Sequence, residues 1–167
     1  MLRIAIFLIL LIGTCLYALW RGGAPERIAA GAMLAACLGS ALVRRDLENR
    51  FFEMETGLFL IDALLLVILI AVALKADRGW PMVLAGLHLA TVGAHVVKLV
   101  EPEMIRVTYV VMITAWSWPM LLALALGTAR HRMRLKAQGY DLDWSLPIPA
   151  SERPRFLRVE GRPRKRS

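Results

Sequence analysis

The sequence predicts an all-α protein, a polytopic membrane helix bundle that ends in an extended basic C-terminal tail. Hydrophobic residues make up 58% of the 167 residues, above the roughly 45–50% that is typical of soluble domains. These residues are gathered in blocks that approach the ~20 residues needed to cross a bilayer. Lys and Arg are concentrated at the C-terminal end, where 11 of the 21 follow residue 129.

Five apolar blocks are the predicted transmembrane helices, and together they form the bundle expected at residues 1–129. The approximate spans are 4–20, 28–43, 56–74, 80–100 and 107–126. The second block is the shortest, so four helices with one re-entrant or tilted segment is the alternative. The first block resembles a secretion signal, but the segment 17–21 lacks a small-x-small cleavage pattern, and we expect a retained helix.

Glycine, proline and charged residues separate the predicted helices. The segment Arg21-Gly22-Gly23-Ala24-Pro25 permits a sharp reversal after the first span. The charged segment 44–55 is expected to be either a short interfacial helix or a solvated loop. Trp80-Pro81 opens the fourth span, with Trp at an interface and Pro in a tolerated first-turn position. In the fifth span, Pro119 frees a backbone carbonyl, so we expect a bend there.

The charge distribution predicts how the bundle is oriented. Cytoplasmic flanks of membrane proteins carry an excess of Lys and Arg. The tail at 130–167 is the most basic segment, so we expect a multi-pass protein of the inner (plasma) membrane with a cytoplasmic C-terminus. Five spans then place the N-terminus on the other side. Arg44, Arg45 and Arg50 oppose this orientation, because it places them on the exterior side.

The tail is expected to contact the membrane surface or a partner. Four basic residues near its start suit anionic lipid or an acidic protein face: Arg130, Arg132, Arg134 and Lys136. The proline-containing segment that follows is expected to be extended and to need a partner for order. A basic segment beside a membrane more often binds lipid or protein than nucleic acid, so no nucleic-acid partner is predicted.

Small residues at helical spacing predict two faces for close helix packing. The second span carries Gly31, Ala35 and Gly39, and the fourth carries Gly86, Ala90 and Gly93. Small residues at such spacings let two helix backbones approach closely. We favour packing inside the bundle, and contact with a second copy or another subunit is the alternative.

A polar stripe in the fourth span is the main candidate site. It consists of His88, Thr91, His95 and Lys98, whose spacings of three, four and three place them on one helix face. Ionisable groups at membrane depth are costly and often mark function. Asp62 and His95 each lie six residues from the same membrane edge, ~9 Å deep at a rise of ~1.5 Å per residue. We therefore expect Asp62 and His95 to meet.

Four interpretations compete for this polar stripe. The favoured one is structural, with polar contacts of roughly 1 kcal/mol each that set the helix register. The second is a proton or ion path, which is weakened because no further acid follows below His88. The third is binding of haem b or a quinone. His88 and His95 share one helix and cannot clamp one haem, so that site needs a homodimer or a methionine ligand such as Met33 or Met112.

The fourth interpretation is a metal site built from Asp62, His95 and Glu101, but no helix presents a dedicated pair of ligands. Cys15 and Cys37 lie in apolar blocks, are not arranged as CxxC, and are expected to be packing residues. No metal or cofactor is therefore predicted.

No sequence motif predicts an enzyme, because GxSxG, P-loop, HExxH and dinucleotide-binding patterns are absent from the sequence. We therefore expect a non-catalytic accessory or assembly subunit of a larger membrane complex, in contact with lipid and with other subunits or a second copy. One alternative is a haem-, quinone- or proton-handling unit that uses Asp62, His88 and His95. The other is a small transporter, which is weakened by the lack of paired halves.

Overall fold

The computed structural model describes residues 2–46, 51–76, 78–100 and 106–139, together with Asp141 and Trp144. All regular structure within these residues is α-helical. Five helices are long and apolar enough to cross a membrane, which confirms the predicted all-α membrane bundle. The second block forms a full candidate span over residues 24–43, which supports five spans over the four-helix alternative.

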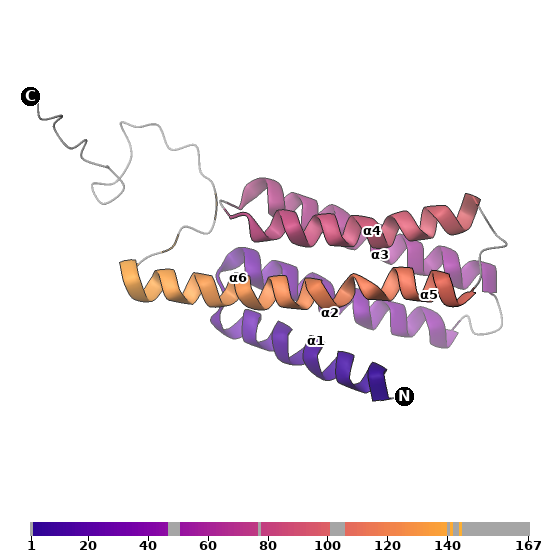
Figure 1. Ribbon diagram of the computed structural model, residues 1–167, viewed down its shortest axis with the longest axis horizontal. Coiled ribbons are helices and arrows are strands. Elements are labelled where there is room, and N and C mark those ends of the chain that lie inside the picture. The colour runs from indigo at the N-terminus through magenta and orange to yellow at the C-terminus, as the bar shows by residue number, and fades with distance from the viewer. Residues whose placement is uncertain are drawn as a thin grey trace, which may run out of the picture.

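The helices run up and down one elongated bundle (Figure 1). They are α1 (Leu2–Arg21), α2 (Ala24–Asp46), α3 (Phe51–Lys75), α4 (Trp80–Val100), α5 (Arg106–Ala115) and α6 (Ser117–Gln138). Contacts join α1 to α2, α2 to α3, α3 to α4, α4 to α6, and α6 back to α1, so the helices form a closed ring. Most of the charged segment 44–55 is continuous with α2 and α3 rather than a separate interfacial helix, and residues 47–50 lie outside the described residues.

The turn between α1 and α2 is as tight as the sequence predicts. The Gly22 N–H donates to the Ala18 carbonyl at 2.8 Å. A Cβ on Gly22 would lie 2.5 Å from that carbonyl oxygen and 2.5 Å from the Glu26 Cβ. Only glycine fits this approach, and the result is that Glu26 is held in the first turn of α2 against the end of α1.

The fifth span is interrupted where the sequence predicts a bend. α5 ends at Ala115 and α6 begins at Ser117, four and two residues before Pro119. Proline has no N–H to donate to the carbonyl one turn earlier, so the helical hydrogen-bond pattern is broken at this point. The regular pattern resumes when the Met120 N–H donates to the Trp116 carbonyl at 3.2 Å.

α6 continues well past residue 129, where we expected the bundle to end. It stops at Gly139, whose positive φ of 76° allows its N–H to donate to the Leu135 carbonyl. The basic residues 130–136 therefore lie on the last turns of a helix. Except for Gly139, Asp141 and Trp144, the segment after Gln138 lies outside the described residues, and so does its predicted extended conformation.

Leucines fill the centre of the ring, and apolar side chains also cover its outside. Leu69, Leu84 and Leu124 come from α3, α4 and α6 and are at most 1% exposed. The outward faces carry large exposed apolar residues such as Leu64 and Leu122. In water such a surface would aggregate, whereas in a membrane it faces lipid, so the pattern fits a membrane bundle.

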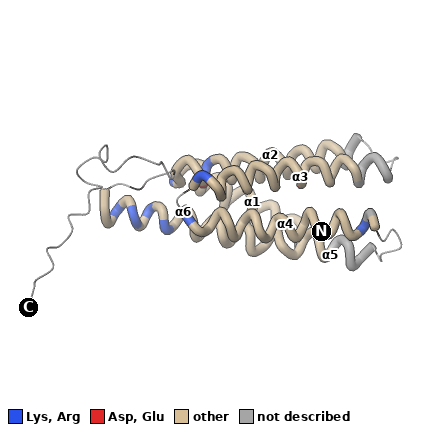
Figure 2. The backbone as a smooth tube through the Cα atoms, turned by 90° about the horizontal axis from the view of Figure 1, so that it is seen from above, with Lys and Arg blue, Asp and Glu red and all other residues tan. Residues whose placement is uncertain are grey.

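Basic residues gather at one end of the bundle, called here the basic end (Figure 2). This is the end where α1 and α3 finish, α2 and α4 begin, and α6 finishes. Its basic residues include Arg21, Arg27, Lys75, Arg78 and the Lys and Arg residues of 130–136. The charge asymmetry of the sequence is therefore also an asymmetry between the two ends of the folded bundle.

Some glycines lie at close contacts between helices. Of the glycines that the sequence predicts to lie at such contacts, only Gly39 does so. A Cβ on Gly39 would lie 3.3 Å from the Ile61 Cδ1, so α2 approaches α3 closely there. Around Gly31, Gly86 and Gly93, by contrast, a Cβ would meet nothing within 4 Å. Of the two alanines, Ala35 is exposed and Ala90 is half-buried.

A close contact between α4 and α6 is made at Gly127, a glycine that is not among those singled out from the sequence. A Cβ on Gly127 would lie 2.8 Å from the Trp80 Cγ and Cδ2, so the indole lies directly against the α6 backbone. We expect Gly127→Ala to lower the free energy of unfolding by about 1–3 kcal/mol, because the fixed ring must move. The midpoint temperature of unfolding in detergent measures this loss.

Gly93→Ala is the matched control for this prediction, because it gives the same helix-propensity gain in open space. We expect it to leave the midpoint unchanged or to raise it slightly. Equal midpoints for the two variants would contradict the close Trp80–Gly127 contact.

Candidate functional site

Two clusters of buried and half-buried polar side chains lie along the bundle, with the leucine core between them. The first, called the Asp62 cluster, consists of Asp62 on α3 and of His88, Thr91 and His95 on α4. The second, called the Arg78 cluster, lies at the basic end and consists of Glu26, Arg78, His131 and Asp141.

The Asp62 cluster contains the contact that matched depth predicts. The His95 Nε2 lies 2.9 Å from the Asp62 Oδ2. The His88 Nε2 donates to the backbone carbonyl of Asp62 at 3.0 Å and lies 3.9 Å from its Oδ1. Helical carbonyls point toward the C-terminus of their helix, and α3 ends at the basic end, so this carbonyl faces the deeper histidine. One residue of α3 thus engages two histidines that lie about two turns apart on α4.

The other two residues of the predicted stripe take different roles. Thr91 lies between the two histidines and is buried, yet its Oγ1 has no hydrogen-bond partner among the described residues. Lys98 is half-buried in the last turn of α4. Phe59 packs against the His95 imidazole edge to face, with ring centroids 6.0 Å apart, and closes the cluster on the α3 side.

The geometry of the Asp62 cluster favours cross-linking of two helices over ligand binding. The Nε2 atoms of both histidines are directed at Asp62, so neither of these nitrogens is free for a haem iron. Within the described part of the chain, no group of three His, Cys, Asp or Glu side chains is arranged for a metal ion. Glu101, the third ligand of the predicted metal site, lies outside the described residues.

The Arg78 cluster is built around a guanidinium whose side chain is 1% exposed. Arg78 lies in the turn between α3 and α4, and its Nη1 donates to the Glu26 Oε1 at 2.5 Å. The Trp80 Nε1 donates to the same oxygen at 3.2 Å. Glu26 is fully buried, so a carboxylate at the start of α2 holds both the turn and the first residue of α4.

The end of α6 completes the Arg78 cluster. The Arg78 Nη2 donates to the Asp141 Oδ2 at 2.9 Å, and the His131 Nδ1 lies 2.6 Å from that oxygen. The Arg134 Nε lies 3.6 Å from the Asp141 Oδ1. The turn at Gly139 brings Asp141 back against α6, and its carboxylate then joins the helix end to the α3–α4 turn.

Sequence analysis missed this cluster, although a signal for it was present. Glu26, Arg78 and Asp141 are far apart in the sequence, and each is typical of a charged residue that flanks a span. In the five-span topology all three fall at the same membrane edge as His131. A lone acidic residue in the first turn of α2, beside a predicted membrane edge rich in arginine, is the signal that predicts an ion pair there.

The two clusters are not connected through polar groups among the described residues. His88 and Trp80 are eight residues apart on α4, a rise of ~12 Å. Leu84 occupies this interval, together with Leu69 and Leu124 from the facing helices, and all three are buried. The leucine layer therefore separates the Asp62 cluster from the basic end.

The four basic residues predicted to contact lipid or a partner lie on the last turns of α6. Arg130 and Lys136 are exposed, and Arg132 and Arg134 are half-buried.

Comparisons with protein-family models, with curated proteins and with solved structures find no match to this chain.

Removing the carboxylate of Glu26 tests the Arg78 cluster. We expect Glu26→Ala to lower the free energy of unfolding by about 3 kcal/mol, because the buried Arg78 charge loses its closest partner. Arg27→Ala, at the exposed neighbouring position, is the control and should change it by less than about 0.5 kcal/mol. Unfolding in detergent measures both, and equal effects would contradict a buried ion pair.

A double-mutant cycle on Asp62 and His95 tests the cross-link between α3 and α4. We expect Asp62→Ala and His95→Ala to show a coupling energy of about 0.6–1.7 kcal/mol, the range found for polar contacts between membrane helices. The control cycle pairs Asp62→Ala with His131→Ala in the other cluster and should be additive. The same small coupling in both cycles would contradict a direct contact.

Proposed function

We propose that this chain is a non-catalytic accessory or assembly subunit of a larger complex in the inner membrane, with its C-terminus in the cytoplasm. The orientation follows from the basic end, where Lys and Arg flank helix termini and where α6 finishes. The support for this role comes from the geometry of the described residues.

The observation that carries the proposal is the outward face of α4. Gly86 and Gly93 share this face with Leu89, which is exposed, and a Cβ at either glycine would meet nothing within 4 Å. A large side chain would cover more lipid-facing surface there than a glycine does. Glycines at such spacing suit the close approach of another helix backbone, so a partner helix is expected to pack on this face.

The polar clusters support a structural role over transport or redox chemistry. Asp62 engages both histidines of its cluster, and the Arg78 cluster joins the ends of three helical segments. Among the described residues, the leucine layer interrupts any polar path between the two clusters. A proton path needs continuous exchangeable groups, so this arrangement favours an accessory subunit over a proton-handling unit.

Purification from the native membrane in a mild detergent tests the proposal. We expect stoichiometric partner chains to elute with the tagged protein. Gly86→Leu combined with Gly93→Leu should abolish this co-elution, because two isobutyl groups would hold the partner backbone away. Gly13→Leu is the matched control, since a Cβ at Gly13 on the outward face of α1 also meets nothing within 4 Å.

Elution of the chain alone, or as a homodimer only, would contradict an accessory subunit. Partner retention by the α4 variant would contradict the role of this face in partner binding.

A truncation that removes residues 145–167 tests the contribution of the tail to partner binding. It leaves Asp141 in the Arg78 cluster, so the fold of the basic end is kept.

A further inference from the structure

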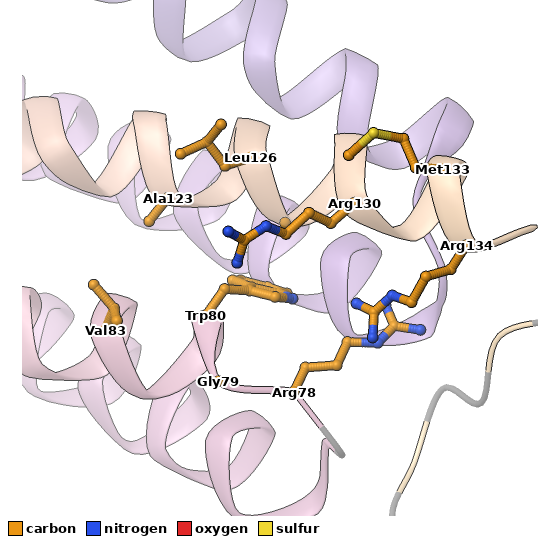
Figure 3. A pocket seen from close by; sticks show the side chains of 10 residues that line it. Arg78, Gly79, Trp80, Val83, Ala123, Leu126, Arg130, Met133 and Arg134 are labelled. Atoms are coloured by element: carbon orange, nitrogen blue, oxygen red, sulfur yellow. The ribbon is translucent and has the colours of Figure 1, made fainter. Parts of the chain in front are cut away.

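A groove between α4 and α6 at the basic end joins an apolar surface to a cationic one (Figure 3). Its volume is about 770 Å³. Val83, Ala123 and Leu126 line its inner part, and three arginines line its outer part: Arg78, Arg130 and Arg134. Ala123 and Arg134 are eleven residues apart on α6, so the groove extends along roughly 16 Å of that helix.

The floor of the groove is fixed by the packing of Trp80. The indole lies against Gly127, where a side chain would collide with it. Its Nε1 donates to the Glu26 Oε1 at 3.2 Å, so the ring is also held by a hydrogen bond. The packing of α4 against α6 therefore fixes the position of the indole that forms the floor of the groove.

The arginines that line the groove differ in their ion pairing. Arg78 pairs with Glu26 and Asp141, and the Arg134 Nε lies 3.6 Å from the Asp141 Oδ1. Arg130 makes no ion pair within the described part of the chain. It is exposed and extends over the groove toward Trp80 (Figure 3).

The order of these surfaces corresponds to the structure of a phospholipid. The cationic part lies toward the end of α6, where basic residues are expected at headgroup level, and the apolar part lies further from that helix end. Val83 and Leu126 are 55% and 52% exposed, so the groove opens sideways toward lipid. A phosphodiester carries a negative charge, which suits the guanidinium of Arg130 that has no ion pair within the described residues.

We propose that the α4–α6 groove binds an anionic phospholipid from the leaflet at the basic end. Arg130 and Arg134 donate to the phosphodiester, and one acyl chain lies along Val83 and Leu126. This site goes beyond the proposed accessory role and holds whether or not a partner packs on the outward glycines of α4.

Lipid retention on the full-length protein tests the site. The protein is purified in detergent and titrated with phosphatidylglycerol or phosphatidylcholine, and bound lipid is counted by native mass spectrometry. We expect one phosphatidylglycerol to bind more tightly than phosphatidylcholine. Arg130→Gln should weaken it by about tenfold, the effect of losing one hydrogen bond to a charged group.

Arg132→Gln is the matched control, because it removes the same charge from the same helix without lining the groove. It should bind phosphatidylglycerol like the unmodified chain. Equal losses in the two variants, or equal binding of the two lipids, would overturn the proposal in favour of diffuse attraction to a basic helix. Inorganic phosphate is the third probe, and displacement of the lipid by millimolar phosphate would overturn it in favour of a soluble phosphate ligand.

Discussion

The buried ion pair between Arg78 and Glu26 is the interaction on which the architecture of the basic end depends. A charge in a low-dielectric environment is tolerated only with a close partner and further hydrogen bonds, so the residues around this pair have little freedom. Glu26 also accepts from Trp80, and Arg78 also donates to Asp141. The starts of α2 and α4 and the end of α6 are thereby brought to one point, and the indole is pressed against Gly127.

Polar contacts and apolar packing stabilise this bundle in different ways. Leucines such as Leu69 and Leu84 fill the interior, but their packing alone sets the helix register weakly. The Asp62 cluster ties α3 to α4 on one side of that layer, and the Arg78 cluster ties α2, α4 and α6 on the other. Two polar contacts separated along the bundle fix both the register and the rotation of α4, which turns Gly86 and Gly93 outward.

The outward face of α4 and the α4–α6 groove suit different molecules. The outward glycines of α4 suit another helix, because they allow backbone approach and carry no charge. The α4–α6 groove suits an amphiphile, because apolar and cationic walls follow one another in the direction of the membrane normal. We propose the first surface for assembly into a complex and the second for recognition of the leaflet at the basic end.

The sequence by itself determined the all-α membrane bundle, the break near Pro119 and the contact between Asp62 and His95, because apolar length, proline chemistry and depth along a helix are local properties. Only the tertiary structure decided that Glu26, Arg78 and Asp141 meet, and that α6 continues as a helix through Gln138. It also decided that Gly86 and Gly93 face outward while Gly127 receives Trp80. These outcomes depend on the order of helices in the ring and on the rotation of each about its axis. Side-chain packing between distant segments sets both, and no local pattern records it.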